Sequence, residues 1–328
     1  IRNTVTKPWR GEEFVPGKTG GIWHDTILSD PKTFNHLIAE RDATSAGLAG
    51  VTTDYLVDYN AVSRKWEPHA AFFEIETDAQ AGTLTVHYTL RENMFWNWWN
   101  SDRKIPVTSD DVVFWYNEIA GDPQFGSSAY GQQFVTMPDG TEKHIECIKI
   151  DDKKFDFVFP RIVAEPLLAT NTSIYPSFLY REAKERGGAE GVKDILGADS
   201  DPAQIPSCGR WFITEYTPSR RVVFQRNPDY WEKDSEGTGI PYPEQMIYQI
   251  VGDMNTDYLL FRQGKTETFS PRPEELNDVI KSQKDGYTVF NAEGSSGAML
   301  WSFNQNPVNG GEKFCGWFSS KKFRQAMS

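Results

Sequence analysis

Arg226-Asn227-Pro228-Asp229-Tyr230-Trp231 is the most informative run of residues in this chain. It follows Arg221-Val222-Val223-Phe224-Gln225, whose composition is typical of a strand. A turn is predicted directly after that strand, because proline cannot continue a strand ladder and Asn and Asp tolerate turn geometry. Tyr230 and Trp231 then supply the large apolar area that holds the turn against a core. We interpret this run as structural and not as a ligand contact.

Upstream of this run, the chain mixes strand and helix patterns. Residues 83–90 alternate with a period near two, which predicts a half-buried strand. Thr108-Ser109-Asp110-Asp111 before Val112 has the capping-box pattern of a helix start. Residues 145–159 read as a hairpin, residues 174–197 as a helix, and residues 121–145 as surface loop. Strands and helices do not alternate strictly, so the class is mixed α/β.

Composition excludes several functions. The 328 residues are 38% hydrophobic and 24% charged, with a net charge of −12 and a mean hydropathy of −0.56. A globular, acidic chain of this kind is unsuited to bind nucleic acid, which requires clustered Lys and Arg. It has no apolar run long enough to span a bilayer. Cys147, Cys208 and Cys315 have no CxxC spacing; a Cys147–Cys208 disulfide fits the sequence, but we favour three free thiols.

Patterns of catalysis, cofactor binding and metal binding are missing from the sequence. P-loop, GxGxxG, HExxH and GxSxG motifs do not occur. The five histidines are scattered, and the adjacent pairs Asp110-Asp111 and Asp151-Asp152 are explained by a helix cap and a turn. We therefore expect no enzymatic activity, no cofactor and no metal site.

Several segments, in order, resemble the family 5 extracellular solute-binding proteins of bacterial ABC importers. They include the acidic-proline stretch near Asp30-Pro31-Lys32-Thr33-Phe34, the strand and helix block of residues 85–114, the run at 221–231, and Phe323-Arg324-Gln325-Ala326. The resemblance covers nearly the whole chain from about Thr26. Departures occur at Ser207-Cys208-Gly209-Arg210-Trp211, where the family has GTGPY, between Asn97 and Lys104, where an expected glycine is missing, and near Thr268, where the family has an aspartate.

The resemblance implies a periplasmic-binding-protein type II fold, which has two lobes and an extra inserted α+β domain. Lobe one would comprise residues 1–49 and 166–268, the inserted domain residues 50–165, and the start of lobe two residues 269–328. In this family about 200 more residues follow the Phe323-Arg324 block, so the resemblance also implies a truncated chain with an incomplete second lobe.

The function implied by the resemblance is capture of peptides by lobe closure and their delivery to an ABC transporter. An oligosaccharide or another small solute is the alternative ligand. The expected partners are the solute and the permease subunits in the membrane, with the receptor itself a monomer. The expected location is the periplasm or the cell surface, with a lipid anchor in the full-length form.

The same resemblance places seven candidate ligand contacts. Tyr130 corresponds to a cleft tyrosine, although a surface-packed loop aromatic is the alternative. Ala49 and Gly50 belong to a first-lobe loop at the cleft mouth. The remaining candidates lie on a strand that lines the cleft: Ser296, Gly297, Met299 and Trp301. Gly297 would allow close backbone approach, and Trp301 would stack on the ligand unless it is an ordinary core residue.

Trp96, Trp98 and Trp99 form an aromatic cluster that has two interpretations. Such a cluster is able to stack on sugars, but clustered aromatic residues more commonly fill a core. We favour the core interpretation.

Overall fold

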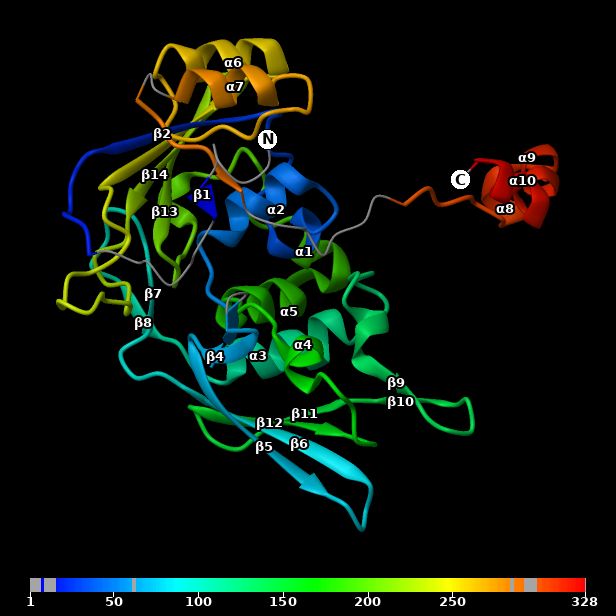
Figure 1. Cartoon of the computed structure of the whole chain (residues 1–328). Helices are drawn as coiled ribbons and strands as arrows, with labels where there is room; N and C mark the ends of the chain where they lie inside the picture. The colour runs from blue at the N-terminus through cyan, green and yellow to red at the C-terminus, as the bar shows by residue number, and fades with distance from the viewer. Residues whose placement is uncertain (1–6, 9–15, 61–62, 284–285, 292–299, 328) are drawn as a thin grey trace. The chain divides into compact units, whose positions relative to one another are not determined.

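Two four-stranded sheets organise residues 11–272 in the computed structural model (Figure 1). The structure describes residues 7–8, 16–60, 63–283, 286–291 and 300–327. The chain divides into two compact units, one of residues 11–272 and one of residues 1–10 with 273–328. The finer lobe and inserted-domain boundaries expected from the sequence stay predictions.

The first sheet has the order β13-β14-β15-β2. Its strands are β13 (Trp211–Thr217), β14 (Arg221–Arg226), β15 (Gln245–Ile250) and β2 (Ile22–Ile27). The first three run antiparallel and β2 joins β15 in parallel. β14 is the strand predicted to precede the Asn227-Pro228 turn, and this prediction is confirmed.

The second sheet is fully antiparallel and has the order β11-β12-β6-β5. Its strands are β5 (Ala71–Asp78), β6 (Thr83–Leu90), β11 (Glu146–Lys149) and β12 (Lys154–Phe159). Burial alternates along β6 as the sequence predicted, and the predicted hairpin at 145–159 is the β11–β12 pair.

Three short hairpins and the helices complete this unit. The hairpins are β3 (Val57–Asn60) with β4 (Lys65–Pro68), β7 (Phe95–Asn97) with β8 (Lys104–Pro106), and β9 (Phe134–Thr136) with β10 (Glu142–His144). The helices are α1 (His36–Ala39), α2 (Ala43–Gly50), α3 (Asp110–Phe114), α4 (Pro166–Thr170), α5 (Ser177–Lys193) and α6 (Met254–Arg262).

The segment 121–145 differs from its prediction as surface loop. It contains a short 3-10 helix, Tyr130–Gln133, and the β9–β10 hairpin. Its polar and glycine-rich composition hides a Phe134-Val135-Thr136 strand that is only three residues long. A strand this short is too brief to give a periodic signal.

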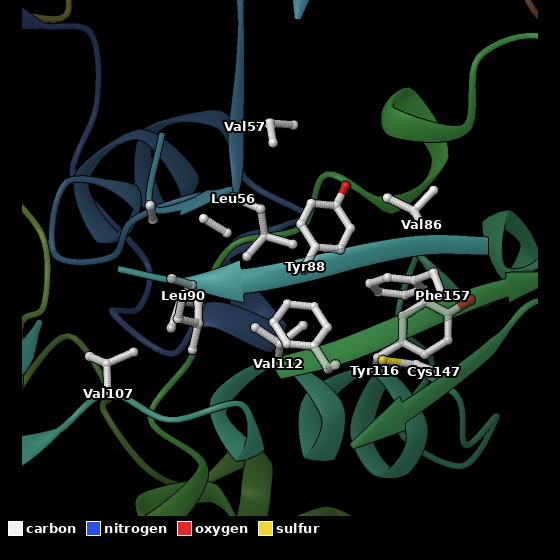
Figure 2. Packing of buried hydrophobic residues seen from close by; sticks show 14 of the residues in the cluster. Leu56, Val57, Val86, Tyr88, Leu90, Val107, Val112, Tyr116, Cys147 and Phe157 are labelled. Carbon is white, nitrogen blue, oxygen red and sulfur yellow. The ribbon is translucent and has the colours of Figure 1, made fainter. Parts of the chain in front are cut away.

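The core of the second sheet lies between β6 and α3. Figure 2 shows Tyr88 and Val86 of β6 beside Phe157 of β12, with Tyr116 and Cys147 close by. Trp96 and Trp98 belong to the same cluster and are 0% and 7% exposed. The core interpretation of these two tryptophans is confirmed, and Trp99 lies 6.2 Å from Phe212, measured between ring centroids.

The three cysteines are free thiols, which confirms the favoured interpretation. Cys147 and Cys208 are buried, and burial raises the pKa of both thiols above the ordinary value. A buried thiol with a raised pKa is largely protonated at neutral pH and behaves as a small apolar side chain.

The described residues of the second unit form helices and one strand pair. β1 (Lys7–Pro8) pairs in parallel with β16 (Phe290–Asn291). The helices are α7 (Leu276–Ser282), α8 (Pro307–Gly310), α9 (Glu312–Phe318) and α10 (Lys321–Met327). Across the described part of both units, no helix has the length and apolar character needed to cross a membrane.

Candidate functional site

The loop before Tyr130 is anchored to the connection between α1 and α2. The Glu40 carboxylate accepts hydrogen bonds from the Ser128 backbone N–H at 2.7 Å and the Ser128 hydroxyl at 3.0 Å. Arg41 donates to the Gly126 carbonyl at 2.6 Å. Tyr130 follows in the 3-10 helix, half-buried, with its ring centroid 5.3 Å from that of Phe134. The candidate tyrosine therefore stands on a loop that charge-assisted hydrogen bonds hold in place.

Ala49 and Gly50 lie at the C-terminal end of α2 and differ in environment. Ala49 is 2% exposed, and its carbonyl accepts a hydrogen bond from the Thr52 hydroxyl at 2.7 Å. Gly50 is exposed, and a Cβ added to it would meet nothing within 4 Å. Of these two candidates, Gly50 is the one whose surface is open to a solute.

The four candidates from the predicted second-lobe strand are only partly described. Ser296, Gly297 and Met299 lie outside the described residues. Trp301 belongs to the 273–328 unit and is 70% exposed. Their contact with a ligand stays a prediction.

A pocket of about 230 Å³ lies beside the Tyr130 helix. Its wall includes the neighbouring Ala129 and Gln132, together with Trp115, Asn171 and Tyr175. The rings of Trp115 and Tyr175 lie 3.9 Å apart between centroids. Aromatic rings with amide groups around them suit a small polar solute. No local pattern in the sequence indicates this pocket, because its wall comes from three separate segments of the chain, at 115–120, 129–133 and 168–175.

The Tyr230-Trp231 pair is held by a buried carboxylate that sequence reasoning missed. Asp54 is 3% exposed. Its oxygens accept hydrogen bonds from the Trp231 indole N–H at 2.7 Å and the Tyr230 hydroxyl at 3.1 Å, and lie 2.7 Å from His69 Nε2. We name Asp54, His69, Tyr230 and Trp231 the Asp54 cluster. It confirms the structural interpretation of the Arg226–Trp231 run.

The Asp54 cluster joins the first sheet to the segment that leads into the second. Tyr230 and Trp231 follow β14, whereas His69 lies between β4 and β5. The Arg91 guanidinium lies 4.5 Å from the Trp231 ring centroid. An indole N–H and a tyrosine hydroxyl packed against a core each require a hydrogen-bond acceptor. The Tyr230-Trp231 pair therefore indicates that a buried acceptor lies nearby. The sequence does not indicate which residue is that acceptor.

Within the Ser207–Trp211 run, Gly209 is the residue that matches the family's GTGPY, and its glycine has a steric reason. The backbone N–H groups of Cys208 and Gly209 both donate to the Thr52 carbonyl at 3.0 Å. A Cβ on Gly209 would lie 2.5 Å from the Thr53 carbonyl oxygen. The glycine is thus required where this turn packs against the segment that follows α2. A second departure, between Asn97 and Lys104, has Asn100 at φ 54°, a conformation that glycine would adopt freely and asparagine tolerates.

Asp111 is a second buried carboxylate in this unit. It accepts from the Ser177 hydroxyl at 2.6 Å and backbone N–H at 2.9 Å, from the Trp96 indole at 3.1 Å, and from the Thr108 N–H at 3.0 Å. The last bond is one half of the predicted capping box. Burial is the largest influence on its pKa and raises it, although these donors oppose the change. The side chain links α3, α5 and β7, and each of its two oxygens accepts two hydrogen bonds.

His36 is the buried histidine of the α1 region. Its Nδ1 lies 3.0 Å from the Tyr180 hydroxyl and its Nε2 lies 3.4 Å from the Thr52 hydroxyl. Burial lowers the pKa of His36 from 6.5 to about 4, so the ring is neutral at pH 7. Among the described residues, no three histidine, cysteine or acidic side chains come together in a way that would hold a metal ion.

These two sheets and the connections between them belong to the type II periplasmic-binding-protein fold. The chain belongs to the bacterial extracellular solute-binding proteins, family 5 (Middle), whose profile matches residues 65–328. This family membership confirms the resemblance found in the sequence.

Relatives and a solved structure agree with that membership. A probable ABC transporter-binding protein of Deinococcus radiodurans is 27% identical over 98% of this chain and 52% of its own length. The dipeptide-binding protein DppE of Bacillus subtilis is 22% identical over 73% of this chain and 41% of its own length. The chain thus spans about half the length of these relatives. The periplasmic binding protein MelB of Agrobacterium fabrum, solved with stachyose, has a TM-score of 0.64 and 19% identity, covering 83% of this chain and 40% of MelB.

Proposed function

We propose that this chain is part of an extracytoplasmic receptor that captures peptides and delivers them unchanged to the membrane subunits of an ABC transporter. Membership of the solute-binding family across residues 65–328 is the observation that carries this proposal. Lobe closure around the solute would be the conformational step, since a ligand that contacts both lobes favours the closed population. Delivery by such a receptor takes place outside the cytoplasm.

Peptides are the solute class that we favour. The relative with 73% coverage of this chain is named a dipeptide-binding protein. Receptors for peptides hold the ligand backbone through main-chain hydrogen bonds and leave the side chains in roomy pockets. Gly50, which faces open space, and Tyr130, on its anchored loop, are the contacts that we propose within residues 11–272. Ala49 would act through its backbone, and Trp301 with Ser296, Gly297 and Met299 are proposed within the other unit.

An oligosaccharide is the second candidate solute. MelB, with the same fold, is solved with stachyose, and the chain has 11 tryptophans. Two of the clustered tryptophans are core residues, Trp96 and Trp98, so they do not add to the case for sugar stacking. Trp301, which is 70% exposed, would be the stacking surface in this alternative.

Binding without chemistry is the mechanism that we propose. The most deeply buried carboxylates, Asp54 and Asp111, are engaged by tryptophan, tyrosine, serine or backbone donors. A carboxylate whose oxygens are used in this way is a poor general base. The receptor would therefore release its solute with no bond made or broken.

Native mass spectrometry of the gently purified receptor tests this proposal. A ladder of bound masses separated by amino-acid residue masses supports peptide capture. Masses separated by hexose units favour the oligosaccharide alternative. Receptor that binds neither kind of solute, in native spectra and in calorimetric titration with peptide and oligosaccharide mixtures, would overturn the proposed function.

A further inference from the structure

The strand β5 forms one edge of the second sheet and lacks the proline, the lysine and the bulge that commonly block edge pairing. It pairs with β6 over eight consecutive residues from Ala71 to Asp78, in unbroken register. Natural edge strands are commonly blunted by proline, lysine or a bulge. β5 has no proline, lysine or arginine, and its register has no shift. The Ala71 N–H donates to the Leu56 carbonyl at 3.0 Å, and beyond it, from Phe73 to Asp78, the outer edge presents a regular row of main-chain groups that no other strand of the described chain pairs with.

Acidic side chains occupy every second position of this edge. Glu74, Glu76 and Asp78 share one face of the strand and are all exposed. The register places Glu74 opposite His87, which in turn lies opposite Asp156 on β12. His87 lies between Asp156 and Glu76, at 2.8 Å and 3.2 Å. Glu74 has no hydrogen bond or ion pair with another residue in the described part of the chain.

Apolar side chains are partly exposed along the same edge, and the Arg91 guanidinium lies 4.6 Å from the Phe72 ring centroid. Phe72 is 49% exposed on the acidic face, and Ile75 is 46% exposed on the opposite face. Beside Phe72, the acidic face has a hollow of about 550 Å³ that Glu74, His87, Ile150 and Asp156 help to line. One further strand along β5 would cover Ile75 on one face and Phe72 on the other. Exposed apolar area beside unpaired main-chain groups is typical of a site for strand addition.

We propose that β5 is a docking edge for an extended, basic segment of a partner protein, which adds to the second sheet as a fifth strand. Main-chain hydrogen bonds would supply the pairing. Lysine or arginine at alternate positions of the segment would lie opposite Glu74, Glu76 and Asp78, since cross-strand neighbours of opposite charge attract. Apolar residues at the positions between them would pack on Ile75. This interaction is separate from solute capture.

Charge decides between this partner and a second copy of the chain. Pairing of two β5 strands would bring the carboxylates of one copy against those of the other, and like charges directly opposite one another destabilise a sheet. The three acidic residues therefore act against self-pairing and in favour of a basic partner. A segment of six to eight residues would match the length of the strand.

The test uses a blocked eight-residue peptide with lysine at alternate positions and valine between them, and the same peptide with glutamate in place of lysine. Binding is measured by fluorescence anisotropy, and hydrogen exchange maps amide protection. The lysine peptide should bind saturably and slow exchange within residues 72–78, whereas the glutamate peptide should not bind. The double variant Glu74→Lys, Glu76→Lys should weaken lysine-peptide binding at least tenfold.

A matched charge control separates the edge from the overall charge. Glu182→Lys with Glu185→Lys changes the net charge equally on exposed positions of α5, and this variant should bind the lysine peptide like the unaltered chain. Unchanged far-ultraviolet circular dichroism verifies folding of both variants. No binding, equal weakening in both variants, or binding without protection of β5 would overturn the proposal. Concentration-dependent dimerisation with protection of β5 would overturn it in favour of a second copy.

Discussion

The two units of this chain differ in how far they bury their apolar side chains. Residues 11–272 bury large aromatic rings completely, among them Trp96, Tyr88 and Phe157. The helices α9 and α10 of the other unit have no buried residue, and Trp301 and Val308 are 70% and 85% exposed. Residues 11–272 thus have a core of their own, whereas the second unit has aromatic contacts, such as Phe303 with Phe318, that leave apolar area in contact with water.

Most of the stability of this chain should reside in residues 11–272. Burial of apolar area and satisfied buried polar groups are the main stabilising contributions in a folded domain. Both are concentrated in residues 11–272, around the core between β6 and α3 and at the Asp54 cluster. Substitutions there should lower the free energy of unfolding, whereas matched substitutions at exposed positions should not.

A pair of tryptophan substitutions gives the largest expected contrast. Trp96→Ala removes a fully buried ring and leaves a cavity, which should lower the free energy of unfolding by about 3–5 kcal/mol. Trp301→Ala removes an exposed ring and should change it by less than about 0.5 kcal/mol. Urea unfolding followed by circular dichroism measures both. Equal losses of unfolding free energy in the two variants would show that the buried Trp96 contributes no more stability than the exposed Trp301.

The Asp54 cluster should have an effect nearly as large. Asp54→Ala leaves the Trp231 indole, the Tyr230 hydroxyl and His69 without their shared acceptor, and should cost about 3–5 kcal/mol. Asp58→Ala, at an exposed position of β3, is the matched control and should cost less than about 0.5 kcal/mol. If Asp54→Ala melts like its control, the cluster does not hold the two parts of this unit together.

Acid should weaken residues 11–272 through His36. Burial lowers the pKa of His36 to about 4 in the folded chain, below the ordinary 6.5. As the pH falls from 6.5 towards 4, the unfolded chain therefore binds a proton that the folded chain does not. Above pH 6.5 the titration of His36 has no effect on the free energy of unfolding. Between pH 6.5 and pH 4 it lowers that free energy by about 3 kcal/mol.

Substitution of the histidine isolates this contribution. His36→Gln should unfold with a shallower pH dependence than the unaltered chain when urea unfolding is compared at pH 7 and at about pH 4.5. Other carboxylates titrate in both proteins, so the difference between the two curves belongs to position 36. Curves that run parallel would show that His36 is not buried in the neutral form.

The smallest expected effect is steric. Gly209→Ala forces a Cβ to within 2.5 Å of the Thr53 carbonyl oxygen and should cost about 1–3 kcal/mol. Gly47→Ala on α2 meets nothing within 4 Å and should stabilise the helix by about 0.5–1 kcal/mol. Thermal unfolding midpoints should move in opposite directions. A rise in both midpoints would mean that the turn at Gly209 is loosely packed.

Local patterns allowed much of the fold to be predicted. The alternation of residues 83–90 specified β6, and the Asn227-Pro228 turn marked the end of β14. Contacts between distant segments could not be predicted in the same way. Asp54 meets Tyr230 across 176 residues, and no local spacing encodes that encounter. The Tyr130 loop is a similar case, since its anchors Glu40 and Arg41 lie on another element.

The candidate site was less predictable than the fold. Tyr130 and Gly50 were named by resemblance, and only the structure distinguishes the open Gly50 from the buried Ala49. The pocket beside Tyr130 arises where α4 and the following residues meet Trp115 and Gln132. Its lining depends on packing, and packing between segments leaves no periodic signature in the sequence.

Recovery of the bound solute shows whether the receptor captures peptides without changing them chemically. The purified receptor is incubated with a defined peptide mixture, separated from free peptide, and acidified to release what it holds. Mass spectrometry should then find peptides with the same masses as those supplied, in amounts that saturate with concentration. Cleaved peptides would show that the protein changes its solute chemically, and no retained peptide at any concentration would show that it does not capture peptides.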